Sequence, residues 1–419
     1  MNRITALALS AVLLTACTAT TPANTPQTSQ PAEQTTSETT SQTEETTVSE
    51  VQTTVDTTTA SQTTETTTAD TAVSASAPGY SLNMIDSKEI TAEDNSDVIL
   101  MRSELKLIEI TDSEHRELSE GLSAYNTIRH DAYDYECGEL SGSVKAHYEG
   151  SPDSFTGEYP MTYSCFVSNS VTRCDSSVFS FINHEDGYSG GAHGWYVTEG
   201  VNFDTETGTE LTVSDICNDI PALLDILADK LEQEYADRLY GTDSEEPRTH
   251  EDYKSVLTEA YGEDLMGYDK TWEDGSVYHM NAMNFVFVPD GVEFFTNQYD
   301  ITPYAAGTQS MTVLFTEAEG LFNEKYISTG EDFIVDNITA IDINSDGKGD
   351  IISYDSIYDD DSDDWKIIGY RVAANGKEYT ADSPNGDYIA RTSLERKDGK
   401  LTIRLYNKDG DLLTAFDLE

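Results

Sequence analysis

The sequence has few basic residues. Of its 419 residues, 24 are Lys or Arg and 78 are Asp or Glu, so its formal charge is −54. Binding to nucleic-acid phosphates needs clustered Lys and Arg, and this charge therefore argues against a nucleic-acid partner. It argues equally against a basic helix that docks on an anionic membrane leaflet. A cationic partner is compatible with the charge, although an acidic exoprotein can owe its charge to solubility alone.

Residues 18–79 lack Leu, Ile, aromatic residues, Lys and Arg, and consist mainly of Thr, Ser, Gln and Glu. Such a segment cannot bury enough apolar surface to offset the entropy of ordering, so we expect a disordered linker over residues 17–79. As a flexible coil it would reach roughly 40–50 Å, which would carry the folded part away from its anchor. The residues after Tyr80 are numerous enough to bury a core.

The first sixteen residues are typical of a secretory signal peptide. Arg3 gives a positive start, and the apolar run 6–14 is too short to span a bilayer. The run ends in L-T-A-C, which resembles the bacterial lipobox, in which the cysteine is diacylated and becomes the mature N-terminus. This resemblance implies a lipid on Cys17 and an extracytoplasmic protein anchored to the cell membrane. An ordinary cleaved signal peptide is the alternative.

The region 80–330 mixes strand and helix patterns. Asp219 followed by Pro221 is a helix start. Pro289-Asp290-Gly291 is a hairpin turn. A second helix is expected over 250–261, and strands over 98–101, 105–110, 161–167, 178–182, 284–288 and 292–296. The apolar stripe of the first helix, which we assign to the core, is Leu223, Leu227, Leu231, Tyr235 and Leu239. The pattern predicts an α+β domain with an antiparallel sheet and packed helices.

Two motifs in this region carry a family resemblance. The first is Y-S-G-G-A-H-G at 188–194, and the second is Y-D-I-T-P-Y-A-A-G at 299–307. Together they resemble a bacterial extracytoplasmic domain family that includes the extracellular part of the lysozyme-sensing anti-sigma factor RsiV and the N-terminal region of the deacetylase PdaC. The motif residues are Gly190, Gly191, Ala192, His193, Gly194, Tyr299, Pro303, Tyr304 and Gly307. The resemblance implies an RsiV-like α+β fold at the cell envelope and, in one member, recognition of lysozyme.

The first motif also has a catalytic interpretation. Residues 187–191 formally match G-x-S-x-G, and His193 follows Ser189 closely. A nucleophile elbow needs a helix after the serine, whereas residues 195–198 are strand-like. Four glycines instead favour a tight loop. His184 and His193 with Glu185 or Asp186 offer metal ligands, but without a spacing diagnostic of zinc. We therefore assign no catalytic residue and do not expect an enzyme, with a hydrolase or deacetylase using Ser189 and His193 as the alternative.

Four cysteines follow Cys17, namely Cys137, Cys165, Cys174 and Cys217. In an oxidising compartment they allow three pairings. A two-residue turn at Asn169-Ser170 would place Cys165 opposite Cys174 in a hairpin, where a disulfide fits. A turn at 175–177 would instead place both on one strand, too far apart to bond. Four reduced thiols are the third alternative.

The segment 342–350, D-I-N-S-D-G-K-G-D, follows a calcium-loop pattern. Oxygen ligands would come from Asp342, Asn344, Asp346, the carbonyl of Lys348, and Asp350. Position 12 is Ser353 and not Glu, so the loop is not an EF-hand. It resembles the calcium loops of FG-GAP or dockerin-type modules, which implies a structural calcium ion. A polar turn without an ion is the alternative.

Residues 331–419 read as a small all-β module. Asn375-Gly376, Asp398-Gly399 and Asp409-Gly410 separate alternating runs, as hairpin turns do. The acidic run 359–364 could bind a second ion, but a solvated loop is the simpler interpretation.

Three functions remain open from the sequence. The first is a lipid-anchored binding module for a cationic protein such as lysozyme or for peptidoglycan. The second is the envelope hydrolase or deacetylase described above. The third is a structural envelope protein without a specific ligand.

Overall fold

The computed structural model describes residues 77–157, 159–239, 248–271, 275–328, 332–336, 351–359, 364–374, 377–382, 389, 391–407 and 411–418. The chain divides into two units, Met1–Val73 and Ser74–Glu419, and the described residues belong to the second. The expected signal peptide, Cys17, the linker up to residue 76 and the loop 342–350 lie outside the described residues, so they stay predictions. None of the described helices is long and apolar enough to cross a membrane.

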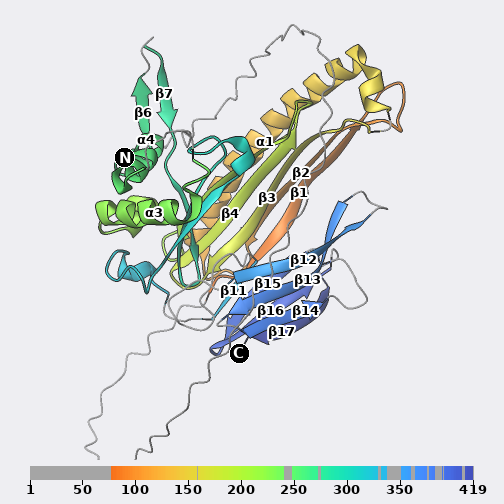
Figure 1. The fold of residues 1–419 in the computed structure, drawn as a ribbon. Coiled ribbons are helices and arrows are strands. Elements are labelled where there is room, and N and C mark those ends of the chain that lie inside the picture. Colours follow the sequence, from red (N-terminus) through yellow and green to blue (C-terminus); the bar gives the residue numbers. More distant parts are fainter. Residues whose placement is uncertain are drawn as a thin grey trace, which may run out of the picture. The chain divides into compact units, whose positions relative to one another are not determined.

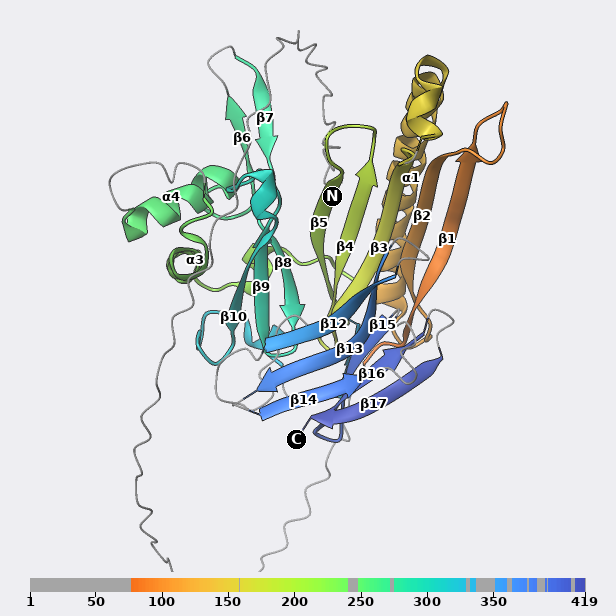
Figure 2. The same cartoon turned by 45° about the vertical axis from the view of Figure 1, so that its right-hand side comes forward.

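A five-stranded sheet organises the fold, with its strands side by side in chain order (Figure 2). Three of its four neighbouring strand pairs are antiparallel and can be joined by hairpins or short loops, but β2 and β3 run parallel. Parallel neighbours need a long crossover connection, and α1 (Arg116–Gly150) supplies it. The strands are β1 (Tyr80–Thr91), β2 (Ile99–Ile110), β3 (Tyr163–Cys174), β4 (Val178–Tyr188) and β5 (Trp195–Asp204).

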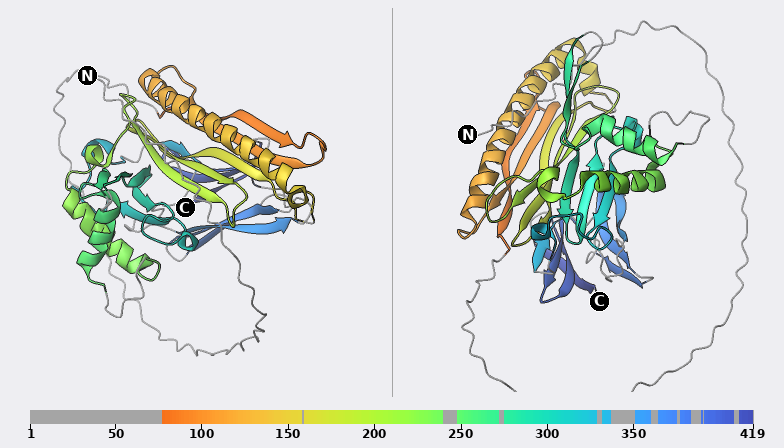
Figure 3. Two further views of the ribbon diagram at one scale, coloured as in Figure 1. Left: turned by 90° about the horizontal axis from the view of Figure 1, so that it is seen from above. Right: turned by 90° about the vertical axis from the view of Figure 1, so that its left-hand side faces the viewer.

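Helix α1 lies across one face of this sheet, as the view from above in Figure 3 shows. Its buried side chains are spaced by three, four, seven or eight residues, so they lie on one face of the helix. They are Leu118, Leu122, Tyr125, Tyr133, Cys137 and Val144. The sequence pattern did not predict this helix, which is the longest of the described elements. It is followed by a short 3-10 helix, η1 (Pro152–Phe155).

The other face of the five-stranded sheet contacts a smaller sheet, in which the order is β10-β9-β8. Gly200 of β5 allows this contact, since a Cβ there would lie 2.0 Å from the carbonyl oxygen of Phe285. Asn202 donates a hydrogen bond of 2.8 Å to the same oxygen. The small sheet consists of β8 (Asn284–Val288), β9 (Gly291–Thr296) and β10 (Gln309–Leu314).

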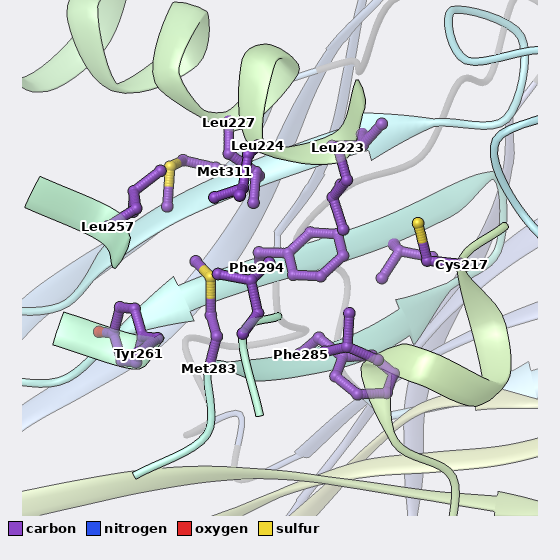
Figure 4. Packing of buried hydrophobic residues seen from close by; sticks show 14 of the residues in the cluster. Cys217, Leu223, Leu224, Leu227, Leu257, Tyr261, Met283, Phe285, Phe294 and Met311 are labelled. Atoms are coloured by element: carbon purple, nitrogen blue, oxygen red, sulfur yellow. The ribbon is translucent and has the colours of Figure 1, made fainter. Parts of the chain in front are cut away.

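The largest apolar core lies between this small sheet and the helices around it (Figure 4). Leu223 and Leu227 of α3 and Leu257 of α4 pack there against Phe294 and Met311. The helices are α2 (Val213–Ile216), α3 (Ile220–Tyr235) and α4 (His250–Tyr261). The remaining elements of this region are β6 (Tyr268–Thr271), β7 (Val277–Met280), η2 (Tyr304–Ala306) and η3 (Glu324–Tyr326).

The C-terminal residues form two further antiparallel sheets (Figure 1). Asp398 and Gly399 both have positive φ angles, 51° and 75°, as a tight hairpin turn between β15 and β16 requires. One sheet has the order β11-β15-β16-β17 and the other β12-β13-β14. Their strands are β11 (Phe333–Val335), β12 (Ile351–Asp359), β13 (Asp364–Ala374), β14 (Lys377–Asp382), β15 (Arg391–Lys397), β16 (Lys400–Tyr406) and β17 (Leu412–Leu418).

The first of these sheets shares a core with the five-stranded sheet. Val335, Leu394 and Ile403 belong to the same buried cluster as Leu118 of α1 and Phe179 of β4. The backbone N–H of Asp336 donates to the carbonyl of Val171 at 2.8 Å. The proposed domain boundary near residue 330 stays a prediction.

The expected α+β class, with antiparallel sheets, packed helices and a C-terminal all-β part, is confirmed. The start of α3 is as expected, because the Asp219 side chain accepts a hydrogen bond of 3.1 Å from the N–H of Ala222. The helix over 250–261 and the hairpin at 284–296 also form where predicted. The two strands expected at 98–101 and 105–110 are a single strand, β2.

The possible disulfide between Cys165 and Cys174, which needed a turn at Asn169-Ser170, does not fit this structure. Strand β3 continues through Asn169-Ser170, and its turn to β4 falls at 175–177, the competing position. Both cysteines therefore lie on one strand, nine residues and roughly 30 Å apart at about 3.3 Å per residue. All four described cysteines are free thiols.

Candidate functional site

The first motif forms the loop between β4 and β5, residues 189–194. Its glycines are needed where the loop touches the rest of the sheet. Gly190 has φ +86°, and a Cβ there would lie 2.5 Å from the hydroxyl of Tyr163. At Gly194 a Cβ would lie 2.8 Å from the carbonyl oxygen of Gly187. The hydroxyl of Tyr188 donates to the carbonyl of Gly191 at 2.9 Å, which closes the loop.

The second motif forms the loop between β9 and β10. Asp300 holds its first half, because its carboxylate accepts hydrogen bonds from the N–H of Asn297 and from the hydroxyl of Tyr261, each at 2.8 Å. Burial raises the pKa of Asp300. Tyr299 has φ +69°, a rare conformation for a residue with a side chain, and its ring is 58% exposed. The loop thus presents an aromatic ring to solvent on a constrained backbone.

The two motifs meet in space. The rings of His193 and Tyr304 are stacked, with centroids 4.0 Å apart and an angle of 27° between their planes. The hydroxyl of Tyr304 donates to the carbonyl of Gly194 at 2.9 Å. Tyr299 and Tyr196 lie 5.8 and 6.5 Å from the Tyr304 ring. We call His193, Tyr196, Tyr299 and Tyr304 the aromatic patch.

Asn297 joins the loops a second time. Its side chain accepts a hydrogen bond from the N–H of Thr198 and donates one to the carbonyl of the same residue, both at 2.8 Å. The amide thereby pairs with the outer edge of β5 as another strand would. The relative position of the two loops is therefore fixed by backbone-directed hydrogen bonds as well as by ring stacking.

A groove of about 620 Å³ lies beside the aromatic patch, between β4–β5 and β9–β10. Tyr196 belongs to both the groove and the patch. The acidic residues Asp186 and Glu293 line the groove, and none of its lining residues is Lys or Arg. Glu185 also borders the groove, but its carboxylate pairs with Arg129 under α1. The site consequently combines exposed aromatic rings with an acidic recess, which suits a ligand that carries positive charge.

Burial changes the titration of the groove residues. It lowers the pKa of His184, which keeps the imidazole neutral, and it raises the pKa of Asp186. Ser310 donates a short hydrogen bond to Glu293, a buried residue at the base of the groove. Of the two groove carboxylates, Asp186 belongs to an exposed residue, and it is the one that a ligand at the surface would meet first.

The opposite face of the same strands holds an ion-pair network under α1. Arg129 donates to Glu185 of β4 at 2.9 Å and to Glu199 of β5 at 2.7 Å. Tyr125 donates to Glu199 at 3.0 Å, and its ring lies 5.2 Å from the Arg129 guanidinium. The pKa of Glu199 is raised, chiefly by burial. This network fixes α1 on the strands that carry the first motif.

Ser189 does not have the backbone geometry of a nucleophile elbow. The loop joins two antiparallel strands, whereas a nucleophile elbow places a helix directly after the serine. Nδ1 of His193 lies 2.7 Å from the carbonyl oxygen of Gly194, so it donates there, and the ring stacks on Tyr304. The strand predicted after the loop, at 195–198, is confirmed as the start of β5.

The metal ligands suggested around the first motif are not brought together. Among the described residues, the group of three that could hold a metal ion is Asp229, Glu232 and His250, on α3 and α4. His250 there already pairs with Asp229 at 3.1 Å and with Asp225 at 3.2 Å. The predicted calcium ligands lie outside the described residues.

Three residues of this region were not predicted from the sequence, namely Tyr196, Asn297 and Arg129. Tyr196 lies two residues after the first motif, and this position could have suggested that it belongs to the same site. Asn297 lies two residues before Tyr299, but its role depends on the contact with β5. Arg129 continues the apolar stripe of α1 at the i+4 position after Tyr125, a signal that needed the helix first.

Comparison with known proteins identifies one domain. Residues 214–316 match the family model described as "Protein of unknown function (DUF3298)". The chain therefore contains a DUF3298 domain of unknown function, which includes the second motif and begins after the first. The narrower resemblance to the RsiV and PdaC domains stays a prediction.

Two solved structures of DUF3298 family proteins resemble the chain. One, from Bacteroides fragilis, is 18% identical with a TM-score of 0.42, and the match covers 60% of this chain and 96% of that one. The other, from Pseudomonas aeruginosa, is 12% identical with a TM-score of 0.34, covering 60% and 97%. No curated protein sequence matches the chain.

Proposed function

We propose that the chain is a cell-surface binding module that captures a basic protein such as lysozyme at the aromatic patch and the adjoining groove. The observation that carries this proposal is the meeting of the two motif loops, with His193 stacked on Tyr304 beside a groove that is lined by carboxylates and lacks basic side chains. Exposed aromatic rings supply contact area at a low cost in side-chain entropy, and tyrosine is enriched at protein interfaces.

The charge of the chain supports the same kind of partner. A formal charge of −54 raises the rate at which a basic protein meets the surface, and it does so less at high salt. The contact itself would depend on the aromatic patch. A salt series therefore separates the two contributions, because screening acts on long-range attraction and leaves apolar contacts in place.

The test measures binding of hen lysozyme to the full chain by surface plasmon resonance, at low and at high salt. We expect saturable binding whose association rate falls with salt, and a loss of at least about tenfold in affinity for His193→Ala, the size expected of an interface anchor. Tyr135→Ala is the matched control, since Tyr135 is 64% exposed and lies on α1. Equal binding by both variants, or no saturable binding, would overturn the proposal.

A cell-wall glycan is the second candidate ligand. The exposed rings of Tyr299 and His193 would stack on sugar faces, and the groove carboxylates would accept hydrogen bonds from hydroxyl groups. Sedimentation of the chain with purified peptidoglycan distinguishes this candidate, because glycan binding should resist high salt while lysozyme binding should weaken. Lysozyme binding without peptidoglycan binding favours the first candidate.

The location of the module is part of the same proposal. Lipid on Cys17 would hold the chain on the outer side of the cell membrane, and residues 18–79 would separate the binding site from the lipid surface. Metabolic labelling with a palmitate analogue tests the anchor, and Cys17→Ala should abolish the label. Label retained in that variant would contradict the assignment.

The two remaining alternatives predict different results. A hydrolase or deacetylase would act on peptidoglycan, and Ser189→Ala and His193→Ala would abolish that activity. A structural envelope protein would bind neither lysozyme nor peptidoglycan.

A further inference from the structure

Two cysteines from distant parts of the chain lie together between the sheet and the C-terminal half of α1. Cys137 is on α1 and Cys165 is on β3, and their exposed fractions are 7% and 0%. Both belong to one buried cluster, together with Tyr133 and Tyr163. The packing of α1 on the five-stranded sheet thus places the two thiols in the same apolar layer.

A direct contact and the strand register place the two thiols next to each other. The thiols of Cys137 and Cys165 are hydrogen-bonded to one another. In addition, Ser103 of β2 is the register partner of Cys165 in the β2–β3 ladder, and its side chain is hydrogen-bonded to Cys137. Cys137 of α1 therefore lies above the paired residues Ser103 and Cys165 of the sheet.

The other two cysteines are elsewhere. Cys174 belongs to the cluster shared with the C-terminal sheet, and its thiol donates to the carbonyl of Pro78 at 3.3 Å. Cys217 belongs to the large core around α3. Among the four described cysteines, Cys137 and Cys165 are thus the pair that shares a cluster.

We propose that Cys137 and Cys165 form a disulfide bond that links α1 to β3 when the chain folds in the presence of a disulfide oxidant. The proposal differs from the pairing of Cys165 with Cys174 that the sequence left possible. It does not depend on the ligand of the binding site.

The bond forms by thiol–disulfide exchange. The Cys137 thiolate attacks one sulfur of an oxidant disulfide, giving a mixed disulfide and releasing one oxidant thiolate. Cys165 then loses its proton to that thiolate and attacks the Cys137 sulfur, expelling the second thiolate, which takes the proton lost by Cys137. Two cysteine thiols and one oxidant disulfide become one cystine and two oxidant thiols, so atoms and electrons balance.

The order of attack follows from the two environments. The hydrogen bond from Cys165 is the main cause that lowers the pKa of Cys137 to about 7, so Cys137 is the better thiolate. The same contact and burial raise the pKa of Cys165. Because both sulfurs are buried in the folded chain, the oxidant reaches Cys137 during refolding, when the two thiols have met and share their hydrogen bond but α1 has not yet closed over them.

The experiment refolds the full chain from denaturant with reduced and oxidised glutathione and then digests it without reduction. Mass spectrometry should show a peptide pair joined through Cys137 and Cys165, while Cys174 and Cys217 are alkylated without prior reduction. Complete alkylation of Cys137 and Cys165, or a bridge that involves Cys174 or Cys217, would overturn the proposal.

Stability provides a second readout. The oxidised chain should melt about 5 °C above the reduced chain, as expected for a bridge that closes a loop of this length in a large domain. The double variant Cys137→Ala/Cys165→Ala should lose this difference, and the control Cys174→Ala/Cys217→Ala should keep it. If the first double variant fails to fold, the peptide map of the unaltered chain still decides the matter. A melting difference that persists without Cys137 and Cys165 would contradict the bridge.

Discussion

The hydroxyl of Tyr304 donates a hydrogen bond of 2.9 Å to the carbonyl of Gly194, 110 residues earlier in the chain. The bond joins the loop that follows β4 to the loop that follows β9. Because a carbonyl oxygen accepts it, the contact does not depend on the side chain at position 194, and glycine is required there for the approach to Gly187. The two motifs therefore form one surface, and substitutions in either loop should affect the same binding event.

Substitutions at Tyr304 separate the ring from its hydroxyl. Tyr304→Phe keeps the stack on His193 and removes one hydrogen bond, so it should cost about 1 kcal/mol of unfolding free energy and leave lysozyme affinity within about threefold. Tyr304→Ala removes the ring and should lower affinity at least about tenfold. Urea denaturation and surface plasmon resonance measure the two effects. Equal affinity for the Phe and Ala variants would exclude the ring from the interface.

The site was predictable from the sequence only as two separate motifs. Each motif can be recognised in the sequence alone, and the four glycines in or next to the first motif correctly indicate a tight loop. Their meeting could not be derived, because it depends on how the hairpin of β4 and β5 packs on that of β8 and β9. Asn297 illustrates the limit, since its amide matters only through the edge of β5 that it reaches.

Two glycines offer a matched test of this packing. A Cβ at Gly200 would lie 2.0 Å from the backbone of Phe285, so Gly200→Ala should force β5 and β8 apart at a cost of about 3 kcal/mol. Gly142 lies in α1, and apart from the nearby backbone of its own helix nothing lies within 4 Å of the corresponding position, so Gly142→Ala should stabilise the protein by about 0.5–1 kcal/mol. Thermal or urea denaturation checks both, and a neutral Gly200→Ala would refute the close approach.

Arg129 should be a large contributor to stability. Arg129→Met leaves Glu185 and Glu199 without their shared partner beneath α1, and breaking a buried ion pair in this manner costs about 3–5 kcal/mol. Arg116→Met on the same helix is the control, because that side chain is 70% exposed and its loss should cost at most about 0.5 kcal/mol. Urea denaturation measures both values.

A rescue experiment tests the cause of the Arg129 effect. Adding Glu185→Gln and Glu199→Gln to Arg129→Met removes the uncompensated charges, so it should recover roughly half of the lost free energy, the remainder being lost hydrogen bonds and packing. No recovery in the triple variant would mean that Arg129 acts through packing alone.

Much of the fold could be predicted from local sequence signals, but its longest described helix, α1, could not. The cap at Asp219 and the turn at Pro289-Asp290 depend on neighbouring residues alone, and both form as predicted. Helix α1 has three internal glycines and a charged residue, Arg129, within its buried stripe, so its apolar pattern is interrupted. The cysteines show the same limit, because one shift of a turn separated Cys165 from Cys174, and the long crossover placed Cys137 beside Cys165.

Calcium binding by residues 342–350 can be tested through the thermal stability of the chain. If residues 342–350 bind calcium, millimolar calcium should raise the melting temperature by several degrees, since a ligand that binds the folded state alone stabilises it by RT ln(1 + [L]/Kd). Chelation should reverse the shift. Asp342→Asn combined with Asp346→Asn should abolish it, and Asp360→Asn in the acidic run serves as a control that keeps it. A shift that survives the loop substitutions would refute the assignment.

The last prediction concerns Glu136, which follows Arg129 by two turns on the sheet side of α1. Burial, with a smaller contribution from Glu185, raises the pKa of Glu136 from 4.5 to about 7. The folded state therefore holds this proton up to about pH 7, whereas the unfolded chain releases it near pH 4.5. Between these values the folded state binds more protons, so the contribution of Glu136 to stability falls as pH rises and reaches its full penalty above pH 7.

Glu136→Gln removes the charge and keeps the shape of the side chain. It should stabilise the protein by about 2 kcal/mol at pH 8, a shift of two to three pKa units discounted for partial exposure, and have little effect near pH 4. Urea denaturation across this range measures the difference between variant and parent. Glu139→Gln, an exposed position on the same helix, should show no such trend. A stability difference for Glu136→Gln that does not change between pH 4 and pH 8 would mean that the carboxyl is not held protonated by its burial under α1.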